Sequence, residues 1–112
     1  MSQHIYNAKG GQMLVAGYDR MLWDFFYDLY AKEGDFPDKV LESYMDGTVN
    51  CKDLNSIRDR VEALLPGVPA NFWECIRSDA EHHVGNRVVL WNPDGSIARD
   101  ESADQPAAEV TT

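Results

Sequence analysis

Four side chains able to bind a metal or to carry a reaction lie close together in the sequence: Cys75, Asp79, His82 and His83. They fall in a segment whose apolar residues recur at helical spacing. Asp79 and His83 are four residues apart, and a helix places such residues on one face, where both can bind one metal ion. A zinc site needs three or four protein ligands, so this group is half a site. Cys51 and His4 are the residues that would have to complete it.

The same group has a simpler interpretation. Histidines near the C-terminus of a helix are favoured by the helix dipole, without any metal. A nucleophilic Cys75 or Cys51 with a distant histidine is another chemistry open to the chain, but no motif marks either cysteine as activated. We therefore predict no enzyme, no cofactor and no metal. A metal- or thiol-dependent enzyme built on this group is the alternative.

Carboxylates are the second group of chemically notable residues. Seven lie between positions 24 and 46, against two lysines in the same interval: Asp24, Asp28, Glu33, Asp35, Asp38, Glu42 and Asp46. Several are four residues apart, which on a helix is a rise of about 6 Å and produces a row of like charges. Such rows destabilise a helix by about 0.2–0.5 kcal/mol per pair, a cost that is sometimes tolerated where the charges have a function.

Rows of this kind fit a groove lined by Lys and Arg on a partner protein, in the manner of a phosphate mimic. Aromatic residues on the same segment would act as anchors beside the charges. The predicted partner-binding residues are Asp24, Asp28, Asp35, Asp38, Glu42, Asp46, Trp23 and Tyr27. The alternative is an ordinary solvated face of an acidic protein.

The overall charge limits the choice of partner. The 112-residue chain has 19 acidic and 10 basic residues and a formal net charge of −9. Nucleic acids and anionic membranes are bound through Lys and Arg, so we expect neither as a partner and favour a basic protein surface. The chain begins without a signal-peptide pattern, and no segment approaches the roughly 18 apolar residues of a membrane span. Two cysteines are too few for a disulfide framework, so we predict reduced thiols and a cytoplasmic protein.

The elements that would position these residues begin with a hairpin. Residues 4–6 and 12–18 are predicted as its strands, joined by a loop that contains Gly10 and Gly11. Residues 19–34 are predicted as a central helix, because large apolar side chains cover more than half of its circumference. Residues 35–47 are predicted as a second helix, with Pro37 in the first turn.

Two further helices and a second hairpin complete the prediction. Residues 54–65 show an amphipathic repeat that ends at Pro66, and a fourth helix opens at Pro69 and closes at Gly85. Residues 87–91 and 96–99 are predicted as strands around the turn 92–95. The expected fold is α+β: an antiparallel sheet of about four strands, from the N- and C-terminal hairpins, packed against four helices. Residues 1–100 would form one domain and residues 101–112 a disordered acidic tail. A homodimer through an open sheet edge is a further alternative.

Two resemblances accompany these patterns. Gly10-Gly11-Gln12 resembles the GGQ tripeptide of peptide-chain release factors, which would imply ester hydrolysis by a positioned glutamine. The match covers three residues, and release factors surround the tripeptide with basic residues, so we interpret it here as a turn. In size and charge the chain is similar to small acidic inhibitors from phages and mobile elements, including anti-CRISPR proteins. That similarity implies an inhibitor that occupies a basic, nucleic-acid-binding surface of its partner.

Overall fold

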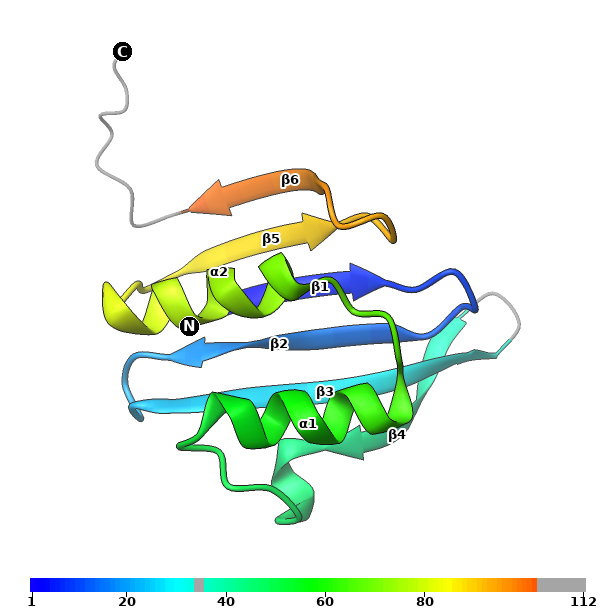
Figure 1. The fold of residues 1–112 in the computed structure, drawn as a ribbon, viewed down its shortest axis with the longest axis horizontal. Coiled ribbons are helices and arrows are strands. Elements are labelled where there is room, and N and C mark those ends of the chain that lie inside the picture. The colour runs from blue at the N-terminus through cyan, green and yellow to red at the C-terminus, as the bar shows by residue number, and fades with distance from the viewer. Residues whose placement is uncertain (34–35, 103–112) are drawn as a thin grey trace.

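The protein folds as a six-stranded mixed sheet with helices on one face. The computed structural model describes residues 1–33 and 36–102, and of residues 32, 33, 36–39 and 102 only the backbone. The elements, in chain order, are β1 (Ser2–Asn7), β2 (Met13–Asp19), β3 (Asp24–Glu33), β4 (Phe36–Ser43), the 3-10 helix η1 (Tyr44–Asp46), α1 (Leu54–Leu64), α2 (Ala70–Glu81), β5 (Arg87–Trp91) and β6 (Ile97–Ser102). The strand order is β4-β3-β2-β1-β5-β6. β1 pairs with β5 in parallel, and the other neighbours are antiparallel. Both α-helices lie across the same face of the sheet (Figure 1).

The predicted fold, with a four-stranded antiparallel sheet and four helices, is wrong. The predicted central helix, residues 19–34, is instead the end of β2, a turn and the long strand β3. Along β3, Tyr27 and Leu29 are buried under the helices, while Asp28 and Tyr30 between and after them point to the other face. β3 carries apolar residues on both of its faces, so they satisfy a helical pattern as well as an alternating one. The aromatic residues of this segment favour the strand.

The second predicted helix, residues 35–47, is also wrong. It is the edge strand β4, followed by the single turn η1. Proline is tolerated in an edge strand, because one side of the strand needs no backbone donor, so Pro37 fits β4. Asp46 accepts a hydrogen bond from the backbone of Ser43, and Ser43 accepts one from Met45, which together cap η1.

The other predicted elements are confirmed. α1 and α2 occur where helical periodicity placed them, and α1 is capped by the Asp53 side chain. β1 and β2 form the first hairpin, and β5 and β6 form the second. β6 continues through residues 101 and 102, and the remaining residues of the predicted tail, 103–112, lie outside the described part of the chain. No helix in the described ranges is long and apolar enough to cross a membrane.

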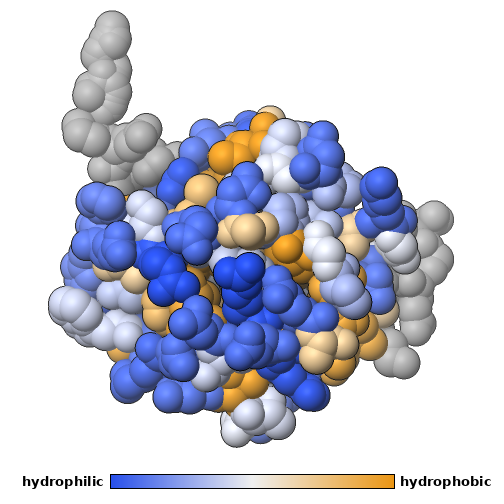
Figure 2. All heavy atoms as spheres, in the orientation of Figure 1, coloured by the Kyte–Doolittle hydropathy of each residue, from blue (hydrophilic) through white to orange (hydrophobic). Residues whose placement is uncertain are grey.

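The core lies between the sheet and the two helices. Alternate residues of β1, β2, β3 and β5 face α1 and α2 and are almost fully buried: Tyr6, Leu14, Ala16, Tyr27, Leu29, Val89 and Trp91. The helices contribute an equally apolar side: Leu54, Ile57, Val61, Phe72, Trp73 and Ile76. The outer surface of this layer is mostly hydrophilic, with apolar residues in separate patches (Figure 2).

The opposite face of the sheet, which we call the open face, carries the other set of alternating residues. They are Gln3, Ile5, Met13, Val15, Gly17, Phe26, Asp28, Tyr30, Val40, Val88, Leu90, Arg99 and Glu101. Most are apolar and partly exposed. Gly17 has a separate role, because a Cβ built there would overlap the carbonyl oxygen of Ser2 and lie 2.8 Å from its carbonyl carbon. Only glycine fits this approach of β1 to β2.

Candidate functional site

The predicted carboxylate rows do not form the two helical rows expected, because their segments are strands. Glu42 lies inward, where Arg60 of α1 binds both carboxylate oxygens at 2.7 and 2.8 Å and the Tyr27 hydroxyl donates at 2.9 Å. These hydrogen bonds, from Arg60 above all, lower the pKa of Glu42 below its ordinary value despite burial. Glu42 and Tyr27 are both buried. Their role in the structure is to join β3 and β4 to α1.

The other predicted partner-binding residues are distributed over several places. Asp24 lies at the start of β3 and pairs with Lys52 at 2.6 Å. Asp28 lies on the open face, opposite Val15. Asp46 caps η1, as described above. Asp35 lies outside the described residues, and so does the side chain of Asp38.

The predicted metal ligands are also separated. His82 ends α2 and bonds the carbonyl of Ser78 through Nδ1, whereas His83 faces the other way, toward Tyr18. Among residues 1–33 and 36–102, no group of three or more His, Cys, Asp or Glu is arranged to hold a metal ion. Burial raises the pKa of the thiols of Cys75 and Cys51, which disfavours the thiolate that a nucleophile requires.

Asp79, the fourth predicted ligand, belongs to a buried polar network. Its Oδ2 lies 2.7 Å from Nε2 of His4, and its Oδ1 lies 2.5 Å from Nη1 of Arg87. The indole N–H of Trp91 points at Nδ1 of His4 at 3.0 Å. An indole N–H can only donate, so Nδ1 accepts and Nε2 carries the proton donated to Asp79. Arg87 also binds Asp100 through two nitrogens, at 2.8 and 3.1 Å.

This network connects α2 to β1, β5 and β6 from beneath the helix. Burial alone raises the pKa of Asp79, but the hydrogen bond from His4 and the charge of Arg87 outweigh it, and the pKa lies below its ordinary value. His4 and Asp79 are 0% and 1% exposed, so no substrate reaches them. The histidine and aspartate therefore stabilise the fold.

The turn between β2 and β3 is the most apolar exposed segment described. Met21 is 83% exposed, Leu22 63% and Trp23 68%. Asp19 builds the turn: its carboxylate accepts from the Met21 amide at 3.0 Å, and its carbonyl accepts from the amides of Leu22 and Trp23 at 3.3 and 2.9 Å. Surface apolar residues are common singly, but three in succession at a fixed turn form a patch that suits an interface. We call residues 21–23 the apolar turn.

Trp23 is held in place by His83, which follows the end of α2. Its ring lies over His83, with the ring centroids 4.2 Å apart, and His83 in turn bonds the hydroxyl of Tyr18 through Nδ1 at 3.1 Å. Trp23 and His83 both have left-handed backbone conformations, with φ of 58° and 53°. Such conformations cost about 1–3 kcal/mol in non-glycine residues and concentrate at functional sites. Two of them in contact fix the orientation of the exposed indole.

Leu22 lies on the other side of the apolar turn, at a small cavity of about 130 Å³. Its apolar lining includes Leu22, Phe26 and Tyr44, and the charged side chains in its lining are Asp19 and Asp24. These two carboxylates are direct partners across β2 and β3, an arrangement that destabilises a strand pair when the charges are alike, and the pairing of Asp24 with Lys52 offsets part of this repulsion. A cavity lined by apolar side chains and two aspartates suits a lysine or arginine side chain, whose alkyl part is apolar and whose end is cationic.

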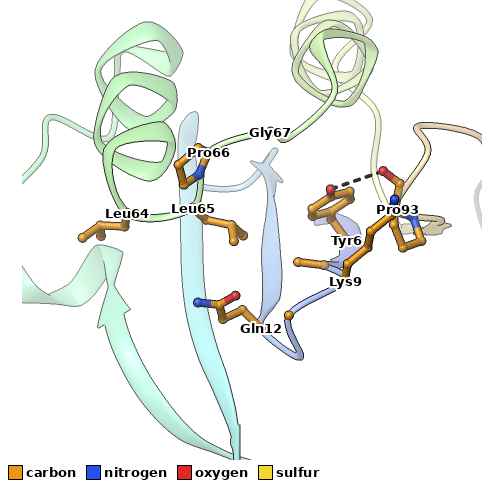
Figure 3. A pocket seen from close by; sticks show the side chains of 10 residues that line it. Tyr6, Lys9, Gln12, Leu64, Leu65, Pro66, Gly67 and Pro93 are labelled. Atoms are coloured by element: carbon orange, nitrogen blue, oxygen red, sulfur yellow. Dashed lines mark hydrogen bonds between the residues drawn. The ribbon is translucent and has the colours of Figure 1, made fainter.

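A second, wider pocket of about 470 Å³ lies at the opposite end of the sheet. Figure 3 shows Leu65 and Pro66 on one side of it and Tyr6, Lys9 and Pro93 on the other. The Tyr6 hydroxyl donates to the Pro93 carbonyl at 3.4 Å. The GGQ tripeptide lies at its rim, in a turn closed by hydrogen bonds between residues 8 and 12 and between 8 and 11, so the prediction of a turn is confirmed. Only Lys9 contributes a charge among the described lining residues, so the pocket offers little to fix a ligand.

Sequence reasoning predicted Asp24 and Trp23 as binding residues but missed Asp19, Met21 and Leu22. A signal was present: Asp19 and Asp24 flank four residues between two apolar, aromatic-rich runs, a pattern typical of a strand, a turn and a strand. No protein-family model, no curated protein and no solved structure matches this chain, so the site is interpreted from its geometry.

Proposed function

We propose that the protein is a small interaction module that binds a basic surface of a partner protein through the apolar turn and the carboxylates beside it. The observation that carries this proposal is the exposure of Met21, Leu22 and Trp23 next to the paired Asp19 and Asp24. Interface hot spots are enriched in tryptophan and arginine, with the anchor in an apolar pocket and a charged rim around it. Here Trp23 would enter the partner, while the partner's lysine or arginine enters the cavity at Leu22.

The charge of the chain supports a protein partner. A net charge of −9 repels phosphate backbones and anionic lipid headgroups, and it accelerates encounter with a basic protein. If the covered cations belong to a nucleic-acid-binding site, the module acts as an inhibitor, as small phage and anti-CRISPR inhibitors do. We propose this mode of action, without enzymatic activity of its own and in the cytoplasm, as the sharpest form of the hypothesis.

The proposal is tested by affinity capture with matched variants. A partner should be retained by the wild-type protein and lost with Leu22→Ser/Trp23→Ala, because the apolar anchor is gone. Leu64→Ser is the control. Leu64 is also an exposed apolar residue, but it is the last residue of α1 and lies at the second pocket, far from the apolar turn. Asp19→Asn/Asp24→Asn should weaken the same partner and reduce the salt dependence of its binding. Equal retention by wild type and Leu22→Ser/Trp23→Ala would contradict the proposal.

Trp23 also supplies an intrinsic probe. The other two tryptophans, Trp73 and Trp91, are 0% and 1% exposed. Acrylamide should therefore quench mainly the fluorescence of Trp23 in the free protein, and Trp23→Phe should remove that quenchable fraction. A saturating amount of the captured partner should protect Trp23 from acrylamide. Unchanged quenching in the complex would show that the partner binds elsewhere.

A further inference from the structure

The apolar composition of the open face is typical of a protein surface that is buried in an interface. Ile5, Val15 and Leu90 lie side by side at its centre, on β1, β2 and β5. Val40 and Val88 are 54% and 36% exposed toward the two edges. A sheet face that meets only water normally alternates to polar residues. Both α-helices lie on the other face (Figure 1). At one end of the open face, Phe26 is 7% exposed and packs against Tyr44 of η1, whereas Ile5, Val15 and Leu90 at the centre are half-buried.

One row across the open face carries opposite charges at its two ends. Arg99 of β6 pairs with Leu90, which lies beside Ile5, and Ile5 pairs with Val15, which pairs with Asp28 of β3. Four strand spacings of about 4.8 Å separate the ends, so Arg99 and Asp28 are about 19 Å apart and do not pair within one chain. The row therefore reads cation, three apolar residues, anion, and the guanidinium of Arg99 also pairs with Glu101 of its own strand.

We propose that the open face is the interface of a homodimer, in which two copies pack face to face around a two-fold axis that passes near Ile5 and runs along the strands. A two-fold interface brings the same pair of positions together twice. With the axis at Ile5, this residue meets its own copy, Leu90 meets the partner's Val15, and Arg99 meets the partner's Asp28. The row is thus complementary to itself in both charge and apolarity.

The available area is that of a small dimer interface. With the axis at β1, five strands, β3-β2-β1-β5-β6, face their partner copies, and at about 4.8 Å per strand and about 6.8 Å for each of three rows they give a footprint of roughly 490 Å² per copy. Two copies would bury about 1,000 Å², the size of a weak, transient interface. Two twisted sheets pack face to face with strand directions within about 30°, which an axis along the strands provides. We expect a dimer whose population depends on concentration.

This interface shares Phe26 with the lining of the cavity at Leu22, but the residues varied in the two sets of tests are different. The apolar turn lies beyond the outermost row of the open face, between the end of β2 and the start of β3. The two proposals therefore fail separately: Trp23 variants test partner binding, and variants on the open face test self-association.

The test is sedimentation velocity from low-micromolar to millimolar concentration. The wild-type protein should change from the mass of one 12.7 kDa chain to that of two. Ile5→Glu should remain monomeric, because it places two like charges at the axis, while Leu64→Glu, on α1, should dimerise as wild type does. Circular dichroism and thermal unfolding establish that both variants are folded.

A mixing experiment tests the arrangement itself. Arg99→Asp and Asp28→Lys should each weaken the dimer by about tenfold or more, because each brings like charges together twice. An equimolar mixture of the two variants should recover dimers, since every Arg99 and Asp28 position then meets an opposite charge. Recovery does not depend on the effect of either substitution on folding. A wild-type protein that stays monomeric, a dimeric Ile5→Glu variant, or a mixture no stronger than its components would each overturn the proposal.

Discussion

Replacing Asp79 by alanine should lower the free energy of unfolding by about 3–5 kcal/mol, because it leaves the charge of Arg87 and the N–H of His4 without their buried acceptor. The loss comes from broken partners and not from lost volume. Chemical denaturation followed by circular dichroism measures it directly. Asp79 also joins α2 to β1 and β5, so the far-ultraviolet spectrum and the cooperativity of unfolding should change together.

Asp100 provides the matched control for Asp79. It binds the same guanidinium of Arg87, but its side chain is 40% exposed, so water replaces the lost contact. Asp100→Ala should cost about 1 kcal/mol or less. Equal effects of the two substitutions would mean that the buried contact with His4 contributes nothing.

The buried carboxylates of Asp79 and Glu42 should make the stability of the protein sensitive to acid. The pKa values of Asp79 and Glu42 lie below their ordinary values of 3.8 and 4.5. At a pH near the ordinary pKa values, the carboxylates of the unfolded chain bind protons while those of the folded chain stay ionised. The stability that these groups contribute is therefore fully present above the ordinary pKa values and is lost as the pH falls through the lowered pKa values of the folded protein. Denaturation at pH 7 and at a series of values below 4.5 should show this decline. The Asp79→Ala variant should lose a smaller amount over the same range.

Replacing Gly17 by alanine should cost about 3 kcal/mol or more, the second large effect expected. The added Cβ would overlap the carbonyl oxygen of Ser2, and Ser2 belongs to the neighbouring strand, so backbone has to move. Ser2 is itself buried and accepts from the Tyr18 amide through its hydroxyl, which limits that movement. Thermal unfolding measures the effect.

Gly10 is the control for Gly17. A Cβ at Gly10 would lie 3.1 Å from Oε1 of Gln12, the end of a flexible side chain that can turn away. Gly10→Ala should therefore change stability by well under 1 kcal/mol. A Gly17→Ala variant as stable as Gly10→Ala would show that β1 and β2 separate more easily than their contact suggests.

The local elements of this fold were predictable where their pattern was unambiguous. α1 and α2 have one apolar and one charged side, and the turn at 92–95 has the residues that its geometry requires. Residues 24–33 were not predictable in the same way, because β3 is apolar on both sides and fits two periodicities. The parallel pairing of β1 with β5 has no local signal, since it joins segments from the two ends of the chain.

For the candidate site, the sequence predicted the kinds of residue at the surface but not where they lie. The sequence indicated an acidic, partly aromatic surface, and Trp23 is exposed beside Asp24. Because residues 19–34 were predicted as a buried central helix, Met21 and Leu22 were expected in the core. In the structure they lie in a turn, and both are exposed. Asp79 and His4 were considered as metal ligands, because the sequence does not show that Arg87 and Trp91 lie beside them.

Because β1 lies inside the sheet, the sheet cannot be completed during synthesis until β5 has been made. β1 to β4 are neighbours in sequence as well as in the sheet, so they can pair through local contacts. β5 pairs with β1 from far along the chain: Met1 and Asn86, which are hydrogen-bonded beside this pairing, are 85 positions apart in the sequence. Closing so long a segment is slow. Until β5 arrives, the backbone groups on one side of β1 have no partner, and such an edge readily recruits a strand from another chain. Aggregation during refolding should therefore begin at β1 and decline once β5 is in place.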